Sequence, residues 1–234
     1  MEKISFVTGG SRGLGFATAL GLSNFGVKPI LFSKDTSRLT HAANSLNTDF
    51  HPVDLENTQE TIKVFTSAIE EHGIPETLVL AHGVMSDRMS KTLKTDVHEW
   101  RRVMSINLDS VFTIVNLVGK LMAEERKGRI IIYSACLGRM SGPGNAGGLA
   151  PYRISKAGVN ALVRNLAHET GHGSRGFFVD AICPNHSRTD MGGPDAPRSA
   201  EEGAETAIWL ATRDLLPGQT QTGFLWEDHE IVPW

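Results

Sequence analysis

The feature that most constrains the fold is a glycine-rich turn between an apolar run and a helical pattern near the start of the chain. Ile4–Val7 is apolar, and Thr8-Gly9-Gly10-Ser11-Arg12-Gly13-Leu14-Gly15 follows it directly. Glycines permit a tight turn and let backbone N–H groups approach a pyrophosphate where the next helix begins. The sequence therefore predicts a strand–turn–helix unit that binds a phosphate-bearing ligand. The same glycines would also fit a turn that binds nothing.

Short apolar runs alternate with segments of helical spacing along the rest of the chain. The predicted strands are Ile4–Val7, Pro29–Phe32, Phe50–Val53, Thr77–Ala81, Arg129–Ser134, Phe177–Ile182 and Gly223–Trp226. The predicted helices are Leu14–Asn24, Leu39–Leu46, Thr58–His72, a long segment from the cap Asp96 to about Arg126, the helix that Pro151 begins, and Ala200–Thr212. This alternation is typical of a parallel sheet covered on both faces. We expect an α/β protein, a Rossmann-type doubly wound fold with a seven-stranded parallel sheet and helices on both faces, and one domain over residues 1–234.

Composition excludes several kinds of partner. The 23 basic and 26 acidic side chains give a net charge of −3, which argues against nucleic acid and anionic membranes. No run of about 18 apolar residues predicts a membrane span, and the first residues lack a signal-peptide pattern. Cys136 and Cys183 have no metal-binding or redox spacing, and we expect two small buried hydrophobic side chains in a reducing cytoplasm. No metal site is predicted.

Tyr152 and Lys156 lie four residues apart, on one face of the helix that Pro151 begins. An ammonium beside a phenol favours the phenolate, so it lowers the tyrosine pKa toward neutrality. Such a phenol can donate and accept a proton near pH 7. Because many helices carry this pair by chance, the pair gains weight only from the rest of the chain.

The end of the second strand bears on the cofactor. Sites selective for NAD usually place an acid there, but this chain reads Phe32-Ser33-Lys34. Arg12 in the glycine turn is also basic. Arg12, Lys34 and the Ser33 hydroxyl would together suit a 2′-phosphate, which predicts NADP(H). The two cations would otherwise be solvated surface charges.

The glycine spacing together with Tyr152-x-x-x-Lys156 resembles the short-chain dehydrogenase/reductase family over nearly the whole chain. Within the family, the sequence motifs are most similar to those of NADP-dependent carbonyl reductases. The segments that carry this closer likeness are Tyr152–Lys156, Thr189–Gly193, Glu201–Thr206 and Pro233-Trp234. The resemblance implies hydride transfer between a nicotinamide and a ketone, aldehyde or alcohol. It also implies a homodimer or homotetramer that pairs through Asp96–Arg126 and the Tyr152 helix.

The resemblance also assigns roles to residues. Tyr152 would be the general acid/base, Lys156 would tune it and hydrogen-bond the ribose, Asn107 would hold a water that links Lys156 to solvent, and Ser134 would hold the substrate oxygen. The residues expected at the cofactor are Gly9, Ser11, Arg12, Gly13, Leu14, Gly15, Ser33, Lys34, Asp54, Leu55, Ala81, Gly83, Tyr152, Lys156, Pro184, Thr189 and Met191.

The expected serine is the first departure from the family pattern. Without a gap, its position falls on Ala135, and Ser134 corresponds to the preceding residue. Successive side chains on a strand point to opposite faces, so the offset matters. Either the turn is one residue longer and Ser134 rotates in, or the serine is absent. Ser141 is a remote substitute.

Two further departures lie beside the predicted site. Ala81-His82-Gly83 replaces Asn-Ala-Gly, and we expect His82 to be a partly exposed loop histidine. Asn185 replaces a glycine after Pro184, and asparagine can adopt the left-handed conformation. His186 would then lie near the substrate mouth, as a polar contact or a rim residue.

Two functions therefore remain open. The first is an NADP(H)-dependent carbonyl reductase or alcohol dehydrogenase, which the retained Tyr152, Lys156 and Asn107 favour. The second is an NADP-binding sensor or partner subunit with weak or lost catalysis. We expect walls for a fairly open pocket from the loop after Gly138 and from the segments Met85–Lys94 and Met191–Ser199.

Overall fold

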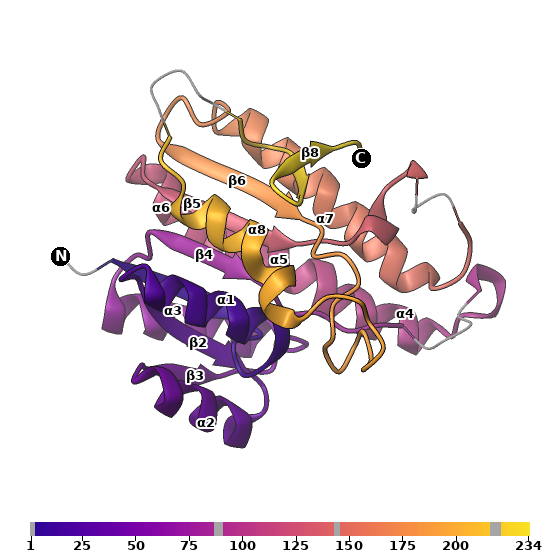
Figure 1. Ribbon diagram of the computed structural model, residues 1–234, viewed down its shortest axis with the longest axis horizontal. Coiled ribbons are helices and arrows are strands. Elements are labelled where there is room, and N and C mark those ends of the chain that lie inside the picture. Colours follow the sequence, from indigo (N-terminus) through magenta and orange to yellow (C-terminus); the bar gives the residue numbers. More distant parts are fainter. Residues whose placement is uncertain (1–2, 87–90, 143–145, 216–220) are drawn as a thin grey trace.

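One eight-stranded sheet forms the centre of the protein in a computed structural model that describes residues 3–86, 91–142, 146–215 and 221–234 (Figure 1). Its strand order is β3-β2-β1-β4-β5-β6-β7-β8. The strands are β1 (Ile4–Thr8), β2 (Lys28–Ser33), β3 (Phe50–Pro52), β4 (Thr77–Leu80), β5 (Gly128–Tyr133), β6 (Phe177–Ile182), β7 (Leu225–Glu227) and β8 (Glu230–Val232). The chain order reverses between β1 and β4, which in such sheets is where ligands bind.

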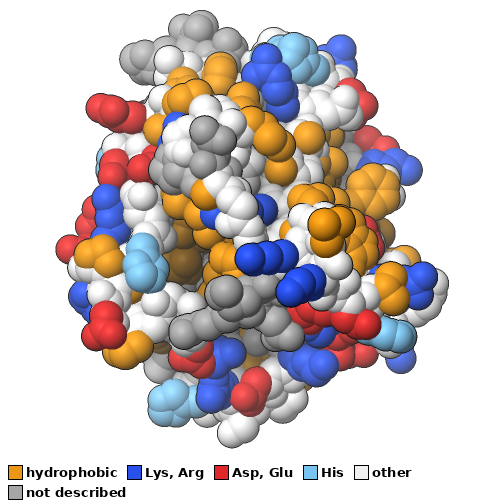
Figure 2. Space-filling view, turned by 90° about the vertical axis from the view of Figure 1, so that its right-hand side faces the viewer, with side chains coloured by type: hydrophobic (Ala, Val, Ile, Leu, Met, Phe, Trp, Pro, Cys, Tyr) orange, Lys and Arg blue, Asp and Glu red, His pale blue; other side chains and the backbone are white. Residues whose placement is uncertain are grey.

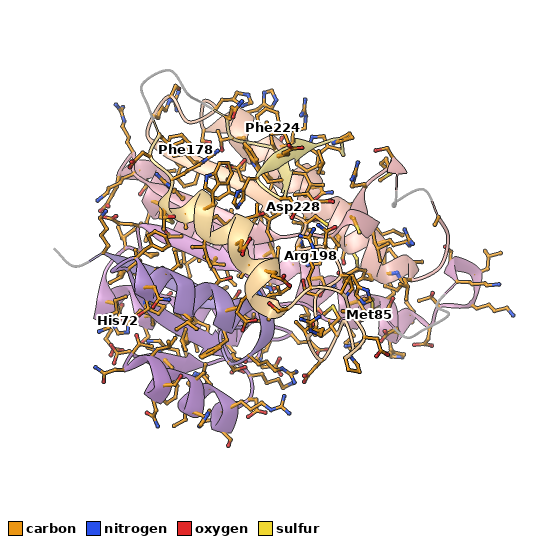
Figure 3. The ribbon with its side chains drawn as sticks, in the orientation of Figure 1. His72, Met85, Phe178, Arg198, Phe224 and Asp228 are labelled. Atoms are coloured by element: carbon orange, nitrogen blue, oxygen red, sulfur yellow. The ribbon has the colours of Figure 1, made fainter. Side chains whose placement is uncertain are left out.

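The edge at β7 and β8 corrects the prediction of seven parallel strands. The pairs from β3 through β7 are parallel, but β8 runs antiparallel to β7. The turn between them places Asp228 at φ 52° and His229 at φ 64°, and two successive left-handed residues make the primed turn that closes tight hairpins. Arg198 donates to the Asp228 carboxylate at 2.7 Å and holds the turn beside α8 (Figure 3).

Helices cover both faces of the sheet, which confirms the α/β doubly wound fold. They are α1 (Gly13–Asn24), α2 (Thr36–Leu46), α3 (Thr58–His72), α4 (Val97–Met104), α5 (Ser110–Ile114), α6 (Lys120–Glu124), α7 (Ala150–Glu169) and α8 (Ala200–Thr212). One hydrophobic layer lies under α1, α2 and α8 and contains Leu22, Leu39 and Leu210. The other lies under α3, the long helix and α7 and contains Phe65 and Val159.

The predicted long helix is continuous from α4 through α6. Asp96 caps it, because its carboxylate accepts from the backbone N–H of His98 at 2.7 Å. Two wider, π-type turns, Ser105–Asp109 and Val115–Gly119, interrupt its regular pitch. By length and composition alone this helix could cross a membrane, although it contains no run of about 18 apolar residues. Its apolar stripe instead packs into the core, with Ile114 and Val118 fully buried.

The carboxyl ends of the strands face one end of the molecule (Figure 1). The glycine turn follows β1 there, and the segments after β4, β5 and β6 lie beside it. Viewed onto this end, the surface is hollowed, and hydrophobic side chains are visible inside the hollow (Figure 2). The fold therefore gathers the predicted site segments at one place.

Candidate active site

Two connected hollows form a single cleft at this end of the sheet. A groove of about 750 Å³ runs along the glycine turn and the end of β2, and a cavity of about 410 Å³ lies against α7. The residues that line both are Leu14, Ala81, His82, Gly83, Thr189 and Met191. The cleft can therefore hold an extended ligand that reaches from the β2 end to Tyr152.

The glycine turn leaves backbone donors free at the start of α1. Gly9 and Gly13 have φ values of +66° and +54°, which side-chain-bearing residues rarely adopt. Gly15 packs so closely on the carbonyl of Gly9 that a Cβ would overlap it. Arg12 precedes the helix and provides no side-chain cap. The first N–H groups of α1 are therefore available to a phosphate.

Basic side chains converge at the β2 end of the groove. Arg12 and Arg38 both contact the carboxylate of Asp190, Arg38 at 3.3 Å. The Ser11 and Ser33 hydroxyls are 2.9 Å apart. The Asp190 carboxylate thus stands where these groups would hold an anion, so the residues fit the 2′-phosphate of NADP(H). No local sequence pattern indicated a role for Arg38, which contacts Asp190 from the first turn of α2.

The remaining predicted cofactor residues line the cleft, with one change of partner. Lys34 forms an ion pair with Asp54 at 2.5 Å rather than pointing free into the groove, and Asp54 and Leu55 form the wall after β3. Gly83 packs closely on the predicted catalytic side chains, because a Cβ there would lie 3.3 Å from Oδ1 of Asn107 and 3.5 Å from Nζ of Lys156. Pro184, Thr189 and Met191 lie on the opposite wall.

Tyr152 and Lys156 are both buried on the first turns of α7 and both line the cavity. Nζ of Lys156 donates to the backbone oxygen of Tyr133 at 2.7 Å and lies 6.0 Å from the centre of the Tyr152 ring. Burial lowers the pKa of Lys156 to about 8 and raises the pKa of Tyr152. The predicted shift of the Tyr152 pKa toward neutrality is therefore not found in this arrangement, because burial is the largest effect on that pKa and the ammonium donates to the Tyr133 carbonyl.

Asn107 lies fully buried in the first π-type turn. Its Oδ1 accepts from the Val84 N–H at 2.8 Å, and its Nδ2 donates to the Val84 carbonyl at 2.9 Å and to the Ser155 hydroxyl at 3.1 Å. The side chain therefore ties the segment after β4 to α7. This amide uses both of its donor directions on the protein, which leaves positioning as its visible role.

Ser134 borders the cavity, but its hydroxyl turns toward α7. The hydroxyl donates to Oδ1 of Asn160 at 2.5 Å and lies 3.4 Å from the Lys156 carbonyl. A serine has one O–H donor, so this bond leaves none for a substrate oxygen. Ala135 follows Ser134 on the cavity wall. Ser141 donates to the Trp234 carbonyl at 3.0 Å and does not line the cavity.

His82 is buried, which corrects the prediction of a partly exposed loop residue. Its Nδ1 lies 2.6 Å from the Thr8 hydroxyl, and its Nε2 lies 2.7 Å from the Ser110 hydroxyl. Burial and the nearby Lys156 charge lower its pKa to about 3. A neutral imidazole thus joins β1, the end of β4 and α5, at the position before Gly83 where the family pattern has an alanine.

The loop after β6 keeps its predicted backbone shape. Asn185 has φ 58°, the left-handed value that the family's glycine would supply. His186 lies on the cavity rim, with Nε2 2.8 Å from the Gly192 carbonyl. Of the other predicted walls, Met85 and Met191 line the cavity, while residues 87–90 lie outside the described residues (Figure 3). The prediction for the loop after Gly138 is wrong for the described residues, because residues 135–137 before it line the cavity instead.

The two cysteines meet at the cavity, a position that the sequence did not predict. Cys136 is half-buried, Cys183 is buried, and both line the cavity. The backbone N–H of Cys136 donates to Sγ of Cys183 at 3.0 Å. A hydrogen bond from the Cys183 thiol lowers the pKa of Cys136 to about 6. The two cysteines are 47 residues apart in the sequence, so no local pattern indicated this contact.

Comparisons with known proteins agree with this arrangement. The family model described as short chain dehydrogenase matches residues 3–199. A 3-oxoacyl-[acyl-carrier-protein] reductase of Pseudomonas aeruginosa is 33% identical over 236 residues, which cover 98% of this chain and 87% of that protein. The corresponding reductase of Synechocystis is 31% identical over 195 residues, which cover 81% of this chain and 76% of that protein. A blue fluorescent protein from a metagenomic library, solved in complex with NADPH, shares the fold with a TM-score of 0.84 and 23% identity, covering 97% of this chain and 96% of that one.

Proposed function

Because the chain belongs to the short-chain dehydrogenase family, as the resemblance predicted, we propose that it is an NADP(H)-dependent oxidoreductase that reduces a ketone or aldehyde, or oxidises the alcohol in reverse. The observation that carries this proposal is the burial of Tyr152 and Lys156 in the cavity at the end of the cofactor groove. NADP(H) supplies or accepts the hydride.

The side chains of this protein would transfer the proton to and from the substrate oxygen and would position the reacting groups. Tyr152 would donate its phenolic proton to the substrate oxygen as charge develops there, and would accept it in reverse. Lys156 would hydrogen-bond the ribose, and its charge would stabilise the phenolate that Tyr152 leaves. Asn107 would hold the Lys156 region in register through Val84 and Ser155.

The cavity favours an apolar carbonyl compound. Met85, Ala135, Leu137, Cys183 and Met191 contribute to its wall. The related reductases of P. aeruginosa and Synechocystis are named for 3-oxoacyl-[acyl-carrier-protein]. We therefore include 3-oxoacyl thioesters among the substrates, beside aromatic aldehydes, diketones and quinones.

The second candidate is an NADP-binding sensor or partner subunit with weak catalysis. Ser134 supports it, because its only O–H donor is engaged by Asn160. The intact Tyr152 and Lys156 favour the reductase. In either case we propose a cytoplasmic homo-oligomer.

The decisive experiment follows NADPH oxidation by the purified protein with the four substrate classes. We expect turnover with at least one class and a loss of at least about 10³-fold in kcat for Tyr152→Phe, with NADPH affinity changed less than about threefold. Tyr133→Phe is the matched control, because the Tyr133 hydroxyl bonds Thr18 in the core and its backbone oxygen is retained. Tight NADPH binding with no turnover of any carbonyl would instead support the sensor.

A further inference from the structure

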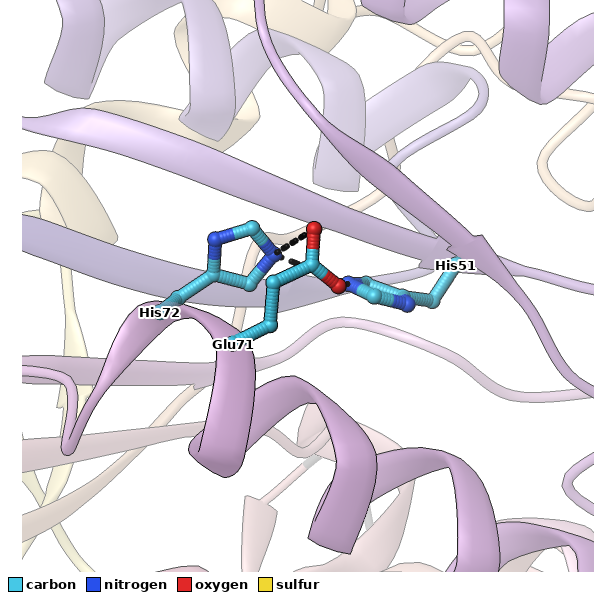
Figure 4. Close-up of side chains that lie close together, drawn as sticks. All are labelled: His51, Glu71 and His72. Atoms are coloured by element: carbon cyan, nitrogen blue, oxygen red, sulfur yellow. Dashed lines mark hydrogen bonds and ion pairs between the residues drawn. The ribbon is translucent and has the colours of Figure 1, made fainter.

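A second group of chemically reactive side chains lies away from the catalytic cavity. His51 on β3 meets Glu71 and His72 at the end of α3 (Figure 4). His72 lies at the end of the molecule opposite Met85, which marks the catalytic cavity (Figure 3). The group therefore belongs neither to the cofactor groove nor to the substrate site.

The potential ligand atoms of the three side chains lie close to one another. Nε2 of His51 lies 3.0 Å from Nε2 of His72. Oε2 of Glu71 lies 3.8 Å from the His51 nitrogen, and Oε1 of Glu71 lies 3.7 Å from the His72 nitrogen (Figure 4). With metal–nitrogen bonds of about 2.0–2.1 Å, a tetrahedral zinc ion holds its ligands about 3.4 Å apart. The observed separations bracket that value, so the ion would enter with small side-chain shifts.

Aromatic packing fixes both imidazole rings. His51 stacks on Phe32 with ring centres 5.3 Å apart and planes 18° apart. His72 meets the edge of Phe6 at 6.5 Å and 83°. The side chains of His51 and His72 are 17% and 9% exposed, while that of Glu71 is 59% exposed. Two rigid ligands and one adaptable carboxylate at the surface give an ion a path in from solvent.

From this geometry we propose that His51, His72 and Glu71 bind a divalent zinc-class ion through the two Nε2 atoms and the carboxylate. Two imidazoles and one carboxylate suit zinc, and among the described residues the group has three members, so water completes the tetrahedron. The ion ties β3, a three-residue strand at the sheet edge, to the end of α3. The sequence did not predict this site, because its two histidines are 21 residues apart and form no local motif.

The test titrates tag-free, metal-depleted protein with Zn²⁺ against a chromogenic chelator. We expect one ion per chain, a loss of affinity of at least about 100-fold for the double variant His51→Gln/His72→Gln, and a loss of about tenfold for Glu71→Gln. Glu71→Gln changes an exposed side chain, so its result stands even if the double variant fails to fold. A Zn²⁺ excess of about 100 Kd should raise the melting temperature of the wild type by roughly 5–10 °C.

The double variant His168→Gln/His172→Gln is the matched control. These residues form another histidine pair, with Nε2 and Nδ1 3.0 Å apart and ring centres at 4.1 Å, but no carboxylate completes a described ligand group there. It should bind zinc as the wild type does. Wild-type binding no tighter than that of Glu71→Gln, or an equal loss in the control, would overturn the proposal and leave His51 and His72 as a structural hydrogen bond.

Discussion

The hydroxyl of Ser134 donates to Oδ1 of Asn160, 2.5 Å away on α7. The Asn160 amide in turn donates to the Gly138 carbonyl at 3.3 Å. Ser134 thus connects the end of β5, the turn after it and the helix that carries Tyr152. This contact gives Ser134 a positioning role that differs from holding the substrate oxygen.

Side-by-side assays of Ser134→Ala and Ala135→Ser separate these roles. For Ser134→Ala we expect a loss of about 1 kcal/mol in the free energy of unfolding and a kcat within about threefold of wild type. Ala135→Ser adds a donor at the cavity wall and should raise kcat about tenfold. A fall of 100-fold or more in kcat for Ser134→Ala, with KM for NADPH unchanged, would show that Ser134 holds the substrate oxygen after rotating.

Asp190 competes with any anion for Arg12 and Arg38. Removing its charge with Asp190→Asn should tighten NADPH binding about two- to fivefold at low salt, because exposed ion pairs are weak. NADH has no 2′-phosphate, so its Kd should stay the same. Calorimetric titration with both cofactors measures this. Arg38→Ala should weaken NADPH alone, and an equal effect on both cofactors would place Arg38 outside the phosphate site.

His82 makes the fold sensitive to acid. Its folded pKa of about 3 lies below its unfolded pKa of 6.5, so the unfolded chain binds the additional proton as the pH falls below 6.5. Between pH 6.5 and 4.5 this removes about 2–3 kcal/mol from the free energy of unfolding. His82→Asn keeps a donor and an acceptor but cannot be protonated, so it should lose this dependence.

Urea unfolding at both pH values measures the His82 effect. Asp180 acts in the opposite direction, because burial raises its pKa to about 7 and stability from that group increases as the pH falls. The informative quantity is therefore the difference between variant and wild type. His186→Asn, on the cavity rim, is the control and should follow the wild type; identical pH dependence in His82→Asn and wild type would contradict the buried neutral imidazole.

Phe112 on α5 supports the proposed self-association. Its side chain is 55% exposed, and Ile154 on α7 is 43% exposed. If these helices pair between subunits, Phe112→Asp should reduce the assembly state measured by light scattering. Phe25, 66% exposed at the end of α1, gives the matched control Phe25→Asp. Loss of assembly in both variants would point to general insolubility rather than to this surface.

Local signals in the sequence were sufficient for most of the fold. The predicted bounds of α3, β6 and α8 agree with the structure, because strong periodicity meets clear caps: Asn57 accepts from two N–H groups of α3, and Ser199 and Glu202 cap α8 reciprocally. The eighth strand escaped prediction because its turn uses Asp228 and His229, neither of which is glycine.

The site was only partly visible in the sequence, because several of its contacts join distant segments. Arg38 contacts Asp190, which is 152 residues away in the sequence, and His82 contacts Thr8, which is 74 residues away. The direction of the Ser134 hydroxyl depends on Asn160, which no local pattern identifies. Motifs predicted which segments gather, whereas the partner of each side chain depends on tertiary packing.

The hydrogen bond from Lys156 to the Tyr133 carbonyl joins α7 to the backbone at the end of β5. Tyr133 belongs to the layer under α1, α2 and α8, and α7 packs its Val159 into the opposite layer. The position of the Lys156 ammonium therefore depends on the packing of both layers, and loosening of either layer would displace it. On heating, catalytic capacity should decline before secondary structure melts, whichever half softens first.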